Sequence, residues 1–402
     1  MLYPLSYEGG VAATRRLYGV GNDSMRQLSQ VIRVPTTRTT LATVRAMSTE
    51  NMSTENLSAV NLPAVMNQVV LRQRPEGLLT WDDVELQQVP VHELAEGEAL
   101  LHNEVLGIDA TVRSWLSPNK GYLPPVGIGE PVRCSSAGRI VASRCDAYAV
   151  GDVVTTLAGW EEFTVVRDDF FTTHLSAADA NYDVAAFLAL YGSTGCTAYI
   201  GMVEIAQVKP GETVVVSAAA GATGNLAAQI AKIAGATVIG IAGSDDKCDW
   251  LVNGLGLDGA INYKTQDVLG RLRELAPNRV DVFFDNVGGQ VLDAVMARLA
   301  MHARVVLCGA ISGYNASAKP PGPANYLNLI QQRATMTGFL AIDDVPRFGE
   351  IAEHLRAWVD AGSLRYQIHY FDGLESSVDA LNAMFTGANT GKIVIRLGNS
   401  PV

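Results

Sequence analysis

Apolar residues are spaced differently in the two halves of this chain. Between residues 69 and 166 they form short runs separated by Gly and Pro, which is the pattern of strands joined by turns. Strands are expected there at residues 69–73, 98–105, 151–157 and 162–166, with a helical segment at 184–191. This half is therefore predicted to form a compact, barrel-like or sheet-rich domain.

From Thr213 onward, strand patterns alternate with helical ones. Residues 213–217 are nearly all apolar, as expected of a parallel strand buried on both faces. The helical pattern that follows ends at Gly235, and further strands are expected at 237–242, 280–285, 304–309 and 335–340. The alternation predicts an α/β fold of Rossmann type, with a doubly wound parallel sheet of at least five strands.

The first 65 residues differ in composition from the rest of the chain. They contain six Arg, no Lys and four acidic residues among many Ser and Thr. A tandem MSTEN repeat at 47–56 and a further Met66 favour a disordered extension over residues 1–65, or a start placed too far upstream. Organelle transit segments share this composition, so mitochondrial import is the alternative to a cytoplasmic location.

Composition and charge exclude some classes of partner. The 30 basic and 41 acidic residues give a net charge of −11, which repels a nucleic-acid backbone. Charged residues or Gly interrupt every apolar segment before it reaches the roughly 20 residues of a membrane span, so no membrane association is expected. The five Cys residues are widely spaced and are predicted to be reduced thiols of a reducing compartment.

A turn of small residues follows the first strand of the α/β half. Residues 218–224 read AAAGATG, and Gly221, Ala222, Thr223 and Gly224 come directly before the helical pattern. Such a turn lets backbone amides at a helix N-terminus approach a pyrophosphate. Ala stands in place of the first Gly of the usual fingerprint, so the turn alone is weak support. Its place between a buried strand and an amphipathic helix predicts dinucleotide binding.

The end of the next strand indicates which nicotinamide cofactor binds. Residues 242–247 read AGSDDK, with Gly243 where a carboxylate would bind the ribose of NAD. Lys247 can then meet the 2′-phosphate of NADPH, which is the predicted cofactor. In the alternative, Asp245 or Asp246 binds the ribose of NAD, and Lys247 is a solvated residue at the start of a helix.

Three blocks of sequence resemble one family. Residues 215–224 (VVSAAAGATG), 284–289 (FDNVGG) and 307–312 (LCGAIS) are similar to blocks of the zinc-independent medium-chain dehydrogenases/reductases. The resemblance is to their prostaglandin, leukotriene, alkenal and curcumin reductases, and extends from about Met66 to Leu397. It implies a Rossmann-type NADPH-binding domain at 191–358 and a discontinuous, sheet-rich GroES-like substrate domain at 66–190 and 359–402. The active site would lie in the cleft between them.

The resemblance also implies a set of cofactor contacts. Residues 221–224 would hold the pyrophosphate, and the adenosine phosphate would be surrounded by Ser244, Lys247 and Tyr263. Asn286 would lie near the cofactor, and its nicotinamide side would be formed by Cys308, Gly309, Ala310, Ile311 and Ser312. Further family positions are Phe339, Leu340 and Asn389. Turn capping by the two Asn residues and core packing of Cys308 and Phe339 are the structural alternatives.

Tyr314 matches the family tyrosine beside the nicotinamide ribose. Reduction of an enone needs hydride at the β-carbon and stabilisation of the negative charge that develops on the carbonyl oxygen. A phenol that is protonated near pH 7 can donate a hydrogen bond to that oxygen or to the ribose. Tyr314 is therefore the predicted catalytic residue, and the alternative is a loop aromatic that packs against the substrate domain.

The substrate side departs from the family pattern. The usual Asp-Pro-Tyr-Met-Arg block reads DATVR at residues 109–113, so Thr111 replaces the tyrosine. This replacement removes a bulky wall or a hydroxyl donor from the predicted pocket. The substrates are therefore expected to differ from the alkenals or prostaglandins usual in the family and to be larger. Tyr122 is the predicted compensating residue, and the alternative is a loop tyrosine held between prolines.

Zinc-dependent alcohol oxidation is not expected. The six His residues include no H-x-x-x-H pair, and residues 129–131 read GEP where a Gly-His-Glu ligand block would fall. The Cys residues form no closely spaced set of four, so no metal is predicted. Residues 192–195 read GSTG and lack the spacing of a G-x-S-x-G nucleophile elbow.

These observations predict an NADPH-dependent reductase of carbon–carbon double bonds conjugated to a ketone or aldehyde. The expected partner is a small enone, alkenal or quinone, and the resemblance implies a homodimer. A quinone oxidoreductase of the same fold and a non-catalytic NADPH-binding sensor are the alternatives. Tyr314 and the block around Asn286 favour an enzyme, whereas Thr111 is most consistent with altered or lost activity.

Overall fold

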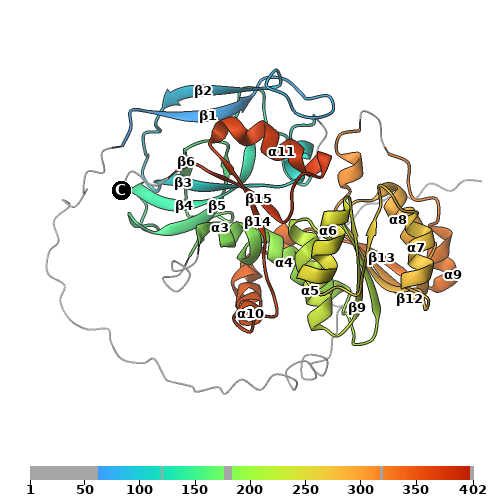
Figure 1. The fold of residues 1–402 in the computed structure, drawn as a ribbon. Helices are drawn as coiled ribbons and strands as arrows, with labels where there is room; N and C mark the ends of the chain where they lie inside the picture. Colours follow the sequence, from blue (N-terminus) through green and yellow to red (C-terminus); the bar gives the residue numbers. More distant parts are fainter. Residues whose placement is uncertain (1–61, 119–120, 176–182, 317–319, 399–402) are drawn as a thin grey trace, which may run out of the picture. The chain divides into compact units, whose positions relative to one another are not determined.

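Residues from Thr213 onward form a six-stranded parallel sheet (Figure 1). Its strands are β8 (Thr213–Ser217), β9 (Thr237–Ala242), β10 (Gly259–Asn262), β11 (Val280–Asp285), β12 (Leu299–Leu307) and β13 (Thr335–Gly338). They lie in the order β10-β9-β8-β11-β12-β13, so the third strand along the chain is at one edge and the sixth at the other. This order confirms the predicted Rossmann-type fold, and its topological switch point lies between β8 and β11.

Both faces of this sheet are covered by helices, which explains why its first strand is almost entirely apolar. Successive side chains of a strand point to opposite faces. Val214 packs in a core with α5 (Ala222–Ile233), whereas Val215 packs in a second core with α7 (Val268–Leu275) and α8 (Gly289–Met296). Each face therefore has its own hydrophobic core.

The computed structural model describes residues 62–118, 121–175, 183–316 and 320–398. Within the chain, Leu57–Val402 forms one compact unit. The predicted extension of residues 1–65 lies almost entirely outside the described residues, and strand β1 already begins at Val65.

A second, mixed sheet combines strands from both ends of the described chain. Its members are β3 (Ala99–Ile108), β4 (Arg133–Ser143), β5 (Val153–Gly159), β6 (Phe163–Val166), β7 (Thr173–His174), β14 (Ile368–Asp372) and β15 (Lys392–Arg396). The order is β14-β15-β3-β4-β5-β7, and β6 also pairs with β3. Because β15 pairs antiparallel with β3, the C-terminal segment belongs to the sheet begun before the parallel one. The exact domain bounds given above stay a prediction.

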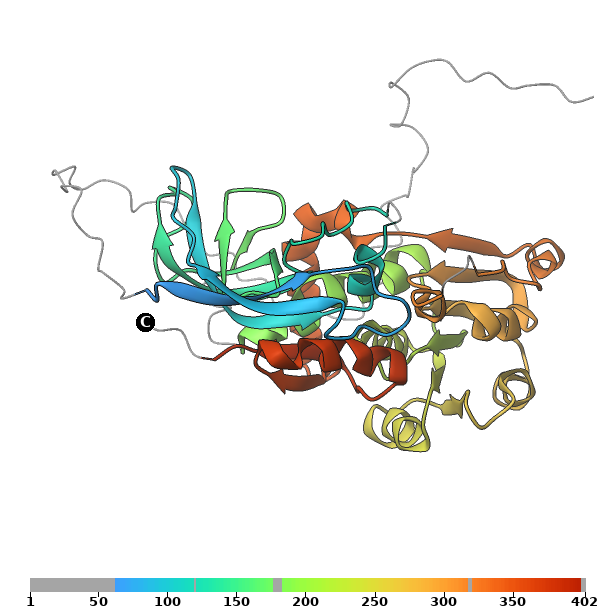
Figure 2. The same ribbon diagram turned by 90° about the horizontal axis from the view of Figure 1, so that it is seen from above.

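A two-stranded hairpin and a helix complete the part of the chain around the mixed sheet. Strand β1 (Val65–Leu71) pairs antiparallel with β2 (Val84–Pro90). Helix α11 (Ser377–Thr386) lies beside this hairpin (Figure 2), and Leu381 of the helix shares a hydrophobic core with Val69 of β1. Residues separated by some 300 positions thus stabilise each other.

One segment of the described residues, Val184–Ile205, is long and apolar enough to cross a membrane by length and composition. It is divided into α3 (Val184–Ala186), η2 (Phe187–Tyr191), α4 (Ser193–Tyr199) and η3 (Ile200–Ile205). The protein buries 78% of its most apolar window, and its neighbours include α5 and α10 (Phe348–Asp360). Core packing therefore accounts for its apolar composition.

The remaining elements are short. They are α2 (Thr111–Trp115), α6 (Asp245–Asp249), η4 (Trp250–Gly254), η5 (Ile311–Gly313), α9 (Leu327–Gln332), η6 (Ala341–Arg347) and η7 (Leu374–Ser376).

Strand ends differ from the predicted ones where the chain turns toward the switch point. Strands β8, β9 and β11 have the predicted bounds, but β12 ends at Leu307 rather than Gly309. The N–H groups of Cys308 and Gly309 both donate to the carbonyl of Asp285, at 2.9 and 3.1 Å. These bonds take the chain across the end of β11 and terminate β12.

Candidate active site

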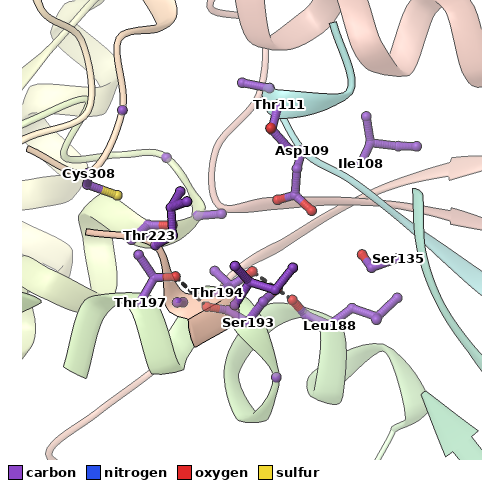
Figure 3. Close-up of a pocket in the computed structure, with 18 of the residues that line it drawn as sticks. Ile108, Asp109, Thr111, Ser135, Leu188, Ser193, Thr194, Thr197, Thr223 and Cys308 are labelled. Atoms are coloured by element: carbon purple, nitrogen blue, oxygen red, sulfur yellow. Dashed lines mark hydrogen bonds between the residues drawn. The ribbon is translucent and has the colours of Figure 1, made fainter. Parts of the chain in front are cut away.

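A cavity of about 470 Å³ lies between the switch point of the parallel sheet and the end of β3. Figure 3 shows Asp109 and Thr111 on one side of it, with Thr223 and Cys308 on the other. The lining brings together fourteen predicted site residues: Thr111, Tyr122, Gly221, Ala222, Thr223, Gly224, Asn286, Cys308, Gly309, Ile311, Tyr314, Phe339, Leu340 and Asn389. Five others lie outside it: Ser244, Lys247, Tyr263, Ala310 and Ser312.

The turn after β8 is shaped by close backbone approaches. Gly221 N–H donates to the Ala218 carbonyl at 2.9 Å, and Ala218 has a positive φ of 47°. A Cβ added at Gly224 would lie 2.2 Å from the Ala218 oxygen, so only glycine fits there. Helix α5 begins at Ala222, and the first N–H groups of a helix lack partners within it. The turn therefore presents amides and the positive end of α5 to the cavity.

A hydrogen-bond network holds the ends of β8 and β11 together at the switch point. Ser217 Oγ donates to Asp285 Oδ1 at 2.7 Å, and the backbone N–H of Asn286 donates to Ser217 Oγ at 2.8 Å. The Asn286 side-chain amide donates to the Ser217 carbonyl at 2.7 Å. Burial raises the pKa of the Asp285 carboxyl, against the hydrogen bonds that it accepts. The Asn286 side chain is thus held by its hydrogen bond to Ser217, and the residue also lines the cavity.

The segment after β12 wraps onto this network. Ile311 N–H donates to the Asn286 carbonyl at 3.2 Å, and Ser312 Oγ donates to the Val287 carbonyl at 2.6 Å. Ser312 is therefore directed to the backbone and lies outside the cavity lining. Burial raises the pKa of the Cys308 thiol to about 12, so this side chain is a neutral wall of the cavity at neutral pH.

Tyr314 presents a protonated hydroxyl to the cavity. Its pKa is raised above the ordinary tyrosine value, mainly by burial, and a hydrogen bond from the Ala310 N–H opposes that shift. In this 3.2 Å bond the Tyr314 oxygen is the acceptor, so the bond does not use the hydroxyl hydrogen. The phenol can therefore donate to a ligand oxygen. Ala310 acts through its backbone, although it does not line the cavity.

Thr111 and Tyr122 form one unit on the opposite wall. Their hydroxyls are 2.8 Å apart. The Tyr122 ring also meets Trp115 edge-on, with ring centroids 6.2 Å apart. Burial raises the pKa of Tyr122, so its hydroxyl is protonated as well. The structure thus places Tyr122 beside the threonine for which it was predicted to compensate.

The cavity also has a hydroxyl-lined floor that the sequence did not reveal. Ser193 and Thr197 line it from α4, and Thr194 lies between them (Figure 3). Thr197 Oγ1 donates to the Ser193 carbonyl at 2.7 Å, and Thr194 Oγ1 donates to the Leu188 carbonyl at 2.9 Å. Because the hydroxyl hydrogens of Thr194 and Thr197 are used on backbone carbonyls, the oxygens of these two side chains remain only as acceptors.

A second predicted group gathers at the end of β9, away from the cavity. Ser244 Oγ caps helix α6 by accepting from the Lys247 N–H, and Lys247 Nζ donates to the Gly387 carbonyl at 2.9 Å. The pKa of Lys247 is lowered by burial and then by the charge of Lys264. Tyr263 is 47% exposed, and a Cβ added at Gly243 would lie 3.1 Å from its ring.

Lys264 is a neighbour that the sequence analysis missed. Its Nζ donates to the Thr386 carbonyl at 3.5 Å, one residue before the carbonyl that Lys247 contacts. Two ammonium groups therefore converge on the carbonyls of Thr386 and Gly387. The Asp245 carboxylate accepts from the Asn262 side-chain amide at 2.7 Å, so it is already engaged within this group. Paired lysines and an N-cap hydroxyl suit a phosphate monoester.

Among the described residues, no group of three or more His, Cys, Asp or Glu side chains could hold a metal ion. The polar groups that line the cavity are hydroxyls, backbone and side-chain amides, and the Asp109 carboxylate.

Comparisons with known proteins agree with this architecture. Residues 67–173 match the family described as the N-terminal domain of oxidoreductase, and residues 222–357 match the family described as zinc-binding dehydrogenase. A Bacillus subtilis (strain 168) protein, provisionally named an NADP-dependent oxidoreductase (YfmJ), is 39% identical over 83% of this chain and 98% of its own.

Two further relatives have names that state an activity. The NADPH-dependent curcumin reductase of Escherichia coli (strain K12) is 33% identical over 82% of this chain and 96% of its own. The NADP(+)-dependent 2-alkenal reductase of Nicotiana tabacum is 34% identical over the same shares of the two chains. The crystal structure of CurA from Vibrio vulnificus in complex with NADPH has a TM-score of 0.78 and 36% identity, over 83% of this chain and all of its own.

The fold and the site define a two-domain oxidoreductase with a Rossmann-type sheet. The chain belongs to the zinc-independent medium-chain dehydrogenase/reductase family, as the resemblance in its sequence predicted.

Proposed function

We propose that this protein uses NADPH to reduce the carbon–carbon double bond of α,β-unsaturated ketones and aldehydes. The observation that carries the proposal is the Tyr314 hydroxyl, which faces the cavity with its hydrogen available between the amide-rich turn and the Thr111–Tyr122 wall. The names of the curcumin and alkenal reductases support the same reaction class for a chain of this family.

The residues present fit NADPH. The turn at 221–224 would hold the pyrophosphate, because it presents the first amides of α5 to the cavity, and Gly224 permits its close backbone approach to Ala218. Lys247 and Lys264, with Ser244 and Tyr263, would hold the phosphate on the adenosine ribose. The YfmJ, curcumin reductase and alkenal reductase names all specify NADP or NADPH, and a relative of known structure binds NADPH.

The protein's own contribution to the reaction is a hydrogen bond to the substrate oxygen. NADPH supplies the hydride that reaches the β-carbon. As negative charge develops on the carbonyl oxygen, the Tyr314 O–H stabilises it, because a buried donor interacts more strongly than one in water. The Ala310 N–H donates to the Tyr314 oxygen and helps to hold it in place.

The opposite wall sets the kind of substrate. Thr111 is smaller than the family's tyrosine, and the hydroxyl of Tyr122 lies next to it. Leu123, Leu157, Phe171 and Leu340 add apolar surface to the cavity. We therefore infer that enones with a bulky apolar substituent are better substrates than short alkenals.

The test is the initial rate of NADPH oxidation with a bulky enone, its saturated analogue and a quinone, repeated with NADH. We expect turnover of the enone, no turnover of the saturated analogue, and a strong preference for NADPH over NADH. Tyr314→Phe should lower kcat by about 10²-fold, as loss of one oxyanion donor does. Tyr326→Phe, which changes an exposed tyrosine outside the cavity, is the matched control.

The other outcomes identify the alternatives. Turnover of the quinone without the enone would make the protein a quinone oxidoreductase. NADPH binding without turnover of either would support a sensor and contradict the proposal.

We also propose that the protein is a cytoplasmic homodimer. The five cysteines are free, which suits a reducing compartment. Strand β13 is an edge of the parallel sheet, and Ile330 of the preceding helix is 73% exposed, as an apolar residue in an interface would be in the isolated chain.

A further inference from the structure

The side chain of Lys392 is buried beneath the cavity. It is 1% exposed, and its Nζ contacts Asp109 Oδ1 at 2.5 Å. Its stem runs past Gly107 of β3, where an added Cβ would lie 3.3 Å from the Lys392 Cε. A buried ammonium needs an ionised partner, and among the described residues that line the cavity Asp109 is the only one with a charged side chain.

The residue before Lys392 is bonded to the turn that would hold the pyrophosphate. Gly391 N–H donates to the Ala220 carbonyl at 2.8 Å, and Gly391 bridges Gly221 in a parallel pairing. Gly391 has a φ of +74°, and a Cβ there would lie 2.1 Å from the Gln367 carbonyl oxygen. Only glycine fits at this point, and its hydrogen bond to Ala220 ties the start of β15 to the turn.

Asp109 is the matching point on the substrate side. It follows β3 directly, and its carbonyl accepts from the Val112 N–H of helix α2 at 3.0 Å. Thr111 of the same helix contacts Tyr122. The Asp109 side chain remains 34% exposed and lines the cavity, so its carboxylate is paired with Lys392 and is still open to a ligand.

We propose that the Lys392–Asp109 ion pair is a positioning device that couples the occupancy of the cofactor turn to the geometry of the substrate wall. The link runs from the turn at Gly221 through Gly391 to Lys392, and then through the ion pair to Asp109 and helix α2. Binding at one site would thereby order the other, and by linkage the effect is reciprocal.

The proposal rests on NADPH binding and is independent of which double bond is reduced. Amide hydrogen exchange, with and without NADP⁺, therefore tests it without turnover. In the unaltered protein, NADP⁺ should slow exchange both at the start of α5 and in the segment 109–115, the latter by about fivefold or more, the lower end of usual couplings. In Lys392→Met, slowing at α5 should remain, and slowing in 109–115 should fall below about twofold.

A double variant separates coupling from folding. Removing only one member of a buried ion pair leaves an unpaired charge, whereas removing both is far better tolerated. Asp109→Asn with Lys392→Met should therefore fold at least as well as Lys392→Met, and it should also lack the effect of NADP⁺ on segment 109–115. Lys232→Met is the matched control, because it breaks the more exposed ion pair between Lys232 of α5 and Asp258. In this variant NADP⁺ should still slow exchange both at α5 and in 109–115.

Two results would overturn the proposal. If NADP⁺ still slows exchange in 109–115 in the double variant, the ion pair does not transmit the effect. If the variants exchange faster with and without NADP⁺ by the same factor, the pair serves stability alone. Failure of the proposed reductase activity would appear separately, as an absence of enone turnover in the unaltered protein.

Discussion

Lys247 and Lys264 are the residues by which this protein would distinguish NADPH from NADH. Both ammonium groups lie near the end of β9, where Gly243 leaves room and the Asp245 carboxylate is engaged by the Asn262 amide. Because Lys264 is exposed to solvent and Lys247 is only partly buried, each lysine should contribute about tenfold, less than a fully buried ionic hydrogen bond. Lys264→Met should therefore raise KM for NADPH about tenfold and leave KM for NADH unchanged. Steady-state kinetics with both cofactors measures this.

The control for that prediction is Lys209→Met, which removes a charge from the loop before β8. If Lys264→Met raises KM for NADPH and KM for NADH by the same factor, the lysine does not recognise the 2′-phosphate. It would then contribute only to folding or to the overall electrostatic potential of the site.

The ionisation of Tyr314 predicts the alkaline side of the pH profile. Burial raises its pKa above the ordinary value of about 10. The donor is the protonated phenol, so it is fully present below that value and is lost as pH rises through the raised pKa. The value of kcat should therefore be flat through neutral pH and fall only above about pH 10. Tyr314→Phe should have a low kcat without this decline.

Tyr122 tests the assignment, because burial raises its pKa as well. Tyr122→Phe should keep the alkaline decline. If the decline disappears with Tyr122 and stays in Tyr314→Phe, the roles of the two tyrosines are reversed.

At the scale of elements, the turn between β8 and α5 depends on one close approach. In Gly224→Ala the new methyl group would lie 2.2 Å from the Ala218 oxygen, which is backbone and cannot rotate away. The free energy of unfolding should fall by about 1–3 kcal/mol, and NADPH should bind more weakly because the turn has shifted. Thermal unfolding and cofactor titration measure the two effects.

Gly349→Ala is the matched control, since Gly349 lies in helix α10 and an added Cβ meets nothing within 4 Å. Alanine is the better helix former, so this variant should be stabilised by up to about 1 kcal/mol. A similar loss of stability in both variants would show that the clash at the turn is not the cause.

The parallel sheet was more predictable than the mixed sheet, for a physical reason. Strands such as β8 are buried on both faces, so continuous apolar runs reveal them. Strand β4 was not predicted, because it carries polar residues such as Ser136 that are buried through hydrogen bonds instead. Ser136 is 0% exposed, and its hydroxyl donates to Asn103 of β3. A local sequence pattern cannot predict that a polar side chain is buried when its hydrogen-bond partner lies in another strand.

In the candidate site, too, some residues could be predicted from the sequence and others could not. The turn at 221–224 could be proposed from the sequence because a short motif places it after a strand end, and Tyr314 could be proposed because it matches a tyrosine of the family that the sequence resembles. Lys264 and Lys392 could not, since each acquires its role from a partner far along the chain: Lys392 contacts Asp109, 283 positions away. The sequence alone does not distinguish a buried, paired lysine from an exposed one, because the fold brings the partner carboxylate to it.

At the scale of the whole molecule, the structure bears on how two copies of the chain would assemble. Strand β13 is an edge of the parallel sheet, and unpaired edges invite pairing with another chain. Tyr326, Leu327 and Ile330 expose apolar surface in and beside the helix that precedes it, with Ile330 at 73%. A homodimer through this edge should have twice the chain mass of 42.8 kDa in light scattering.

Ile330→Lys should shift this protein toward the monomer, because a charge placed in an apolar interface has to be desolvated without a partner. Val252→Lys makes the same change at a residue that is 37% exposed on a different part of the parallel-sheet region. It should leave the mass unchanged. A dimer that survives Ile330→Lys must use another surface, and a monomeric unaltered protein would remove the homodimer altogether. In the monomeric case, the cavity is still complete within one chain, so enone turnover should persist.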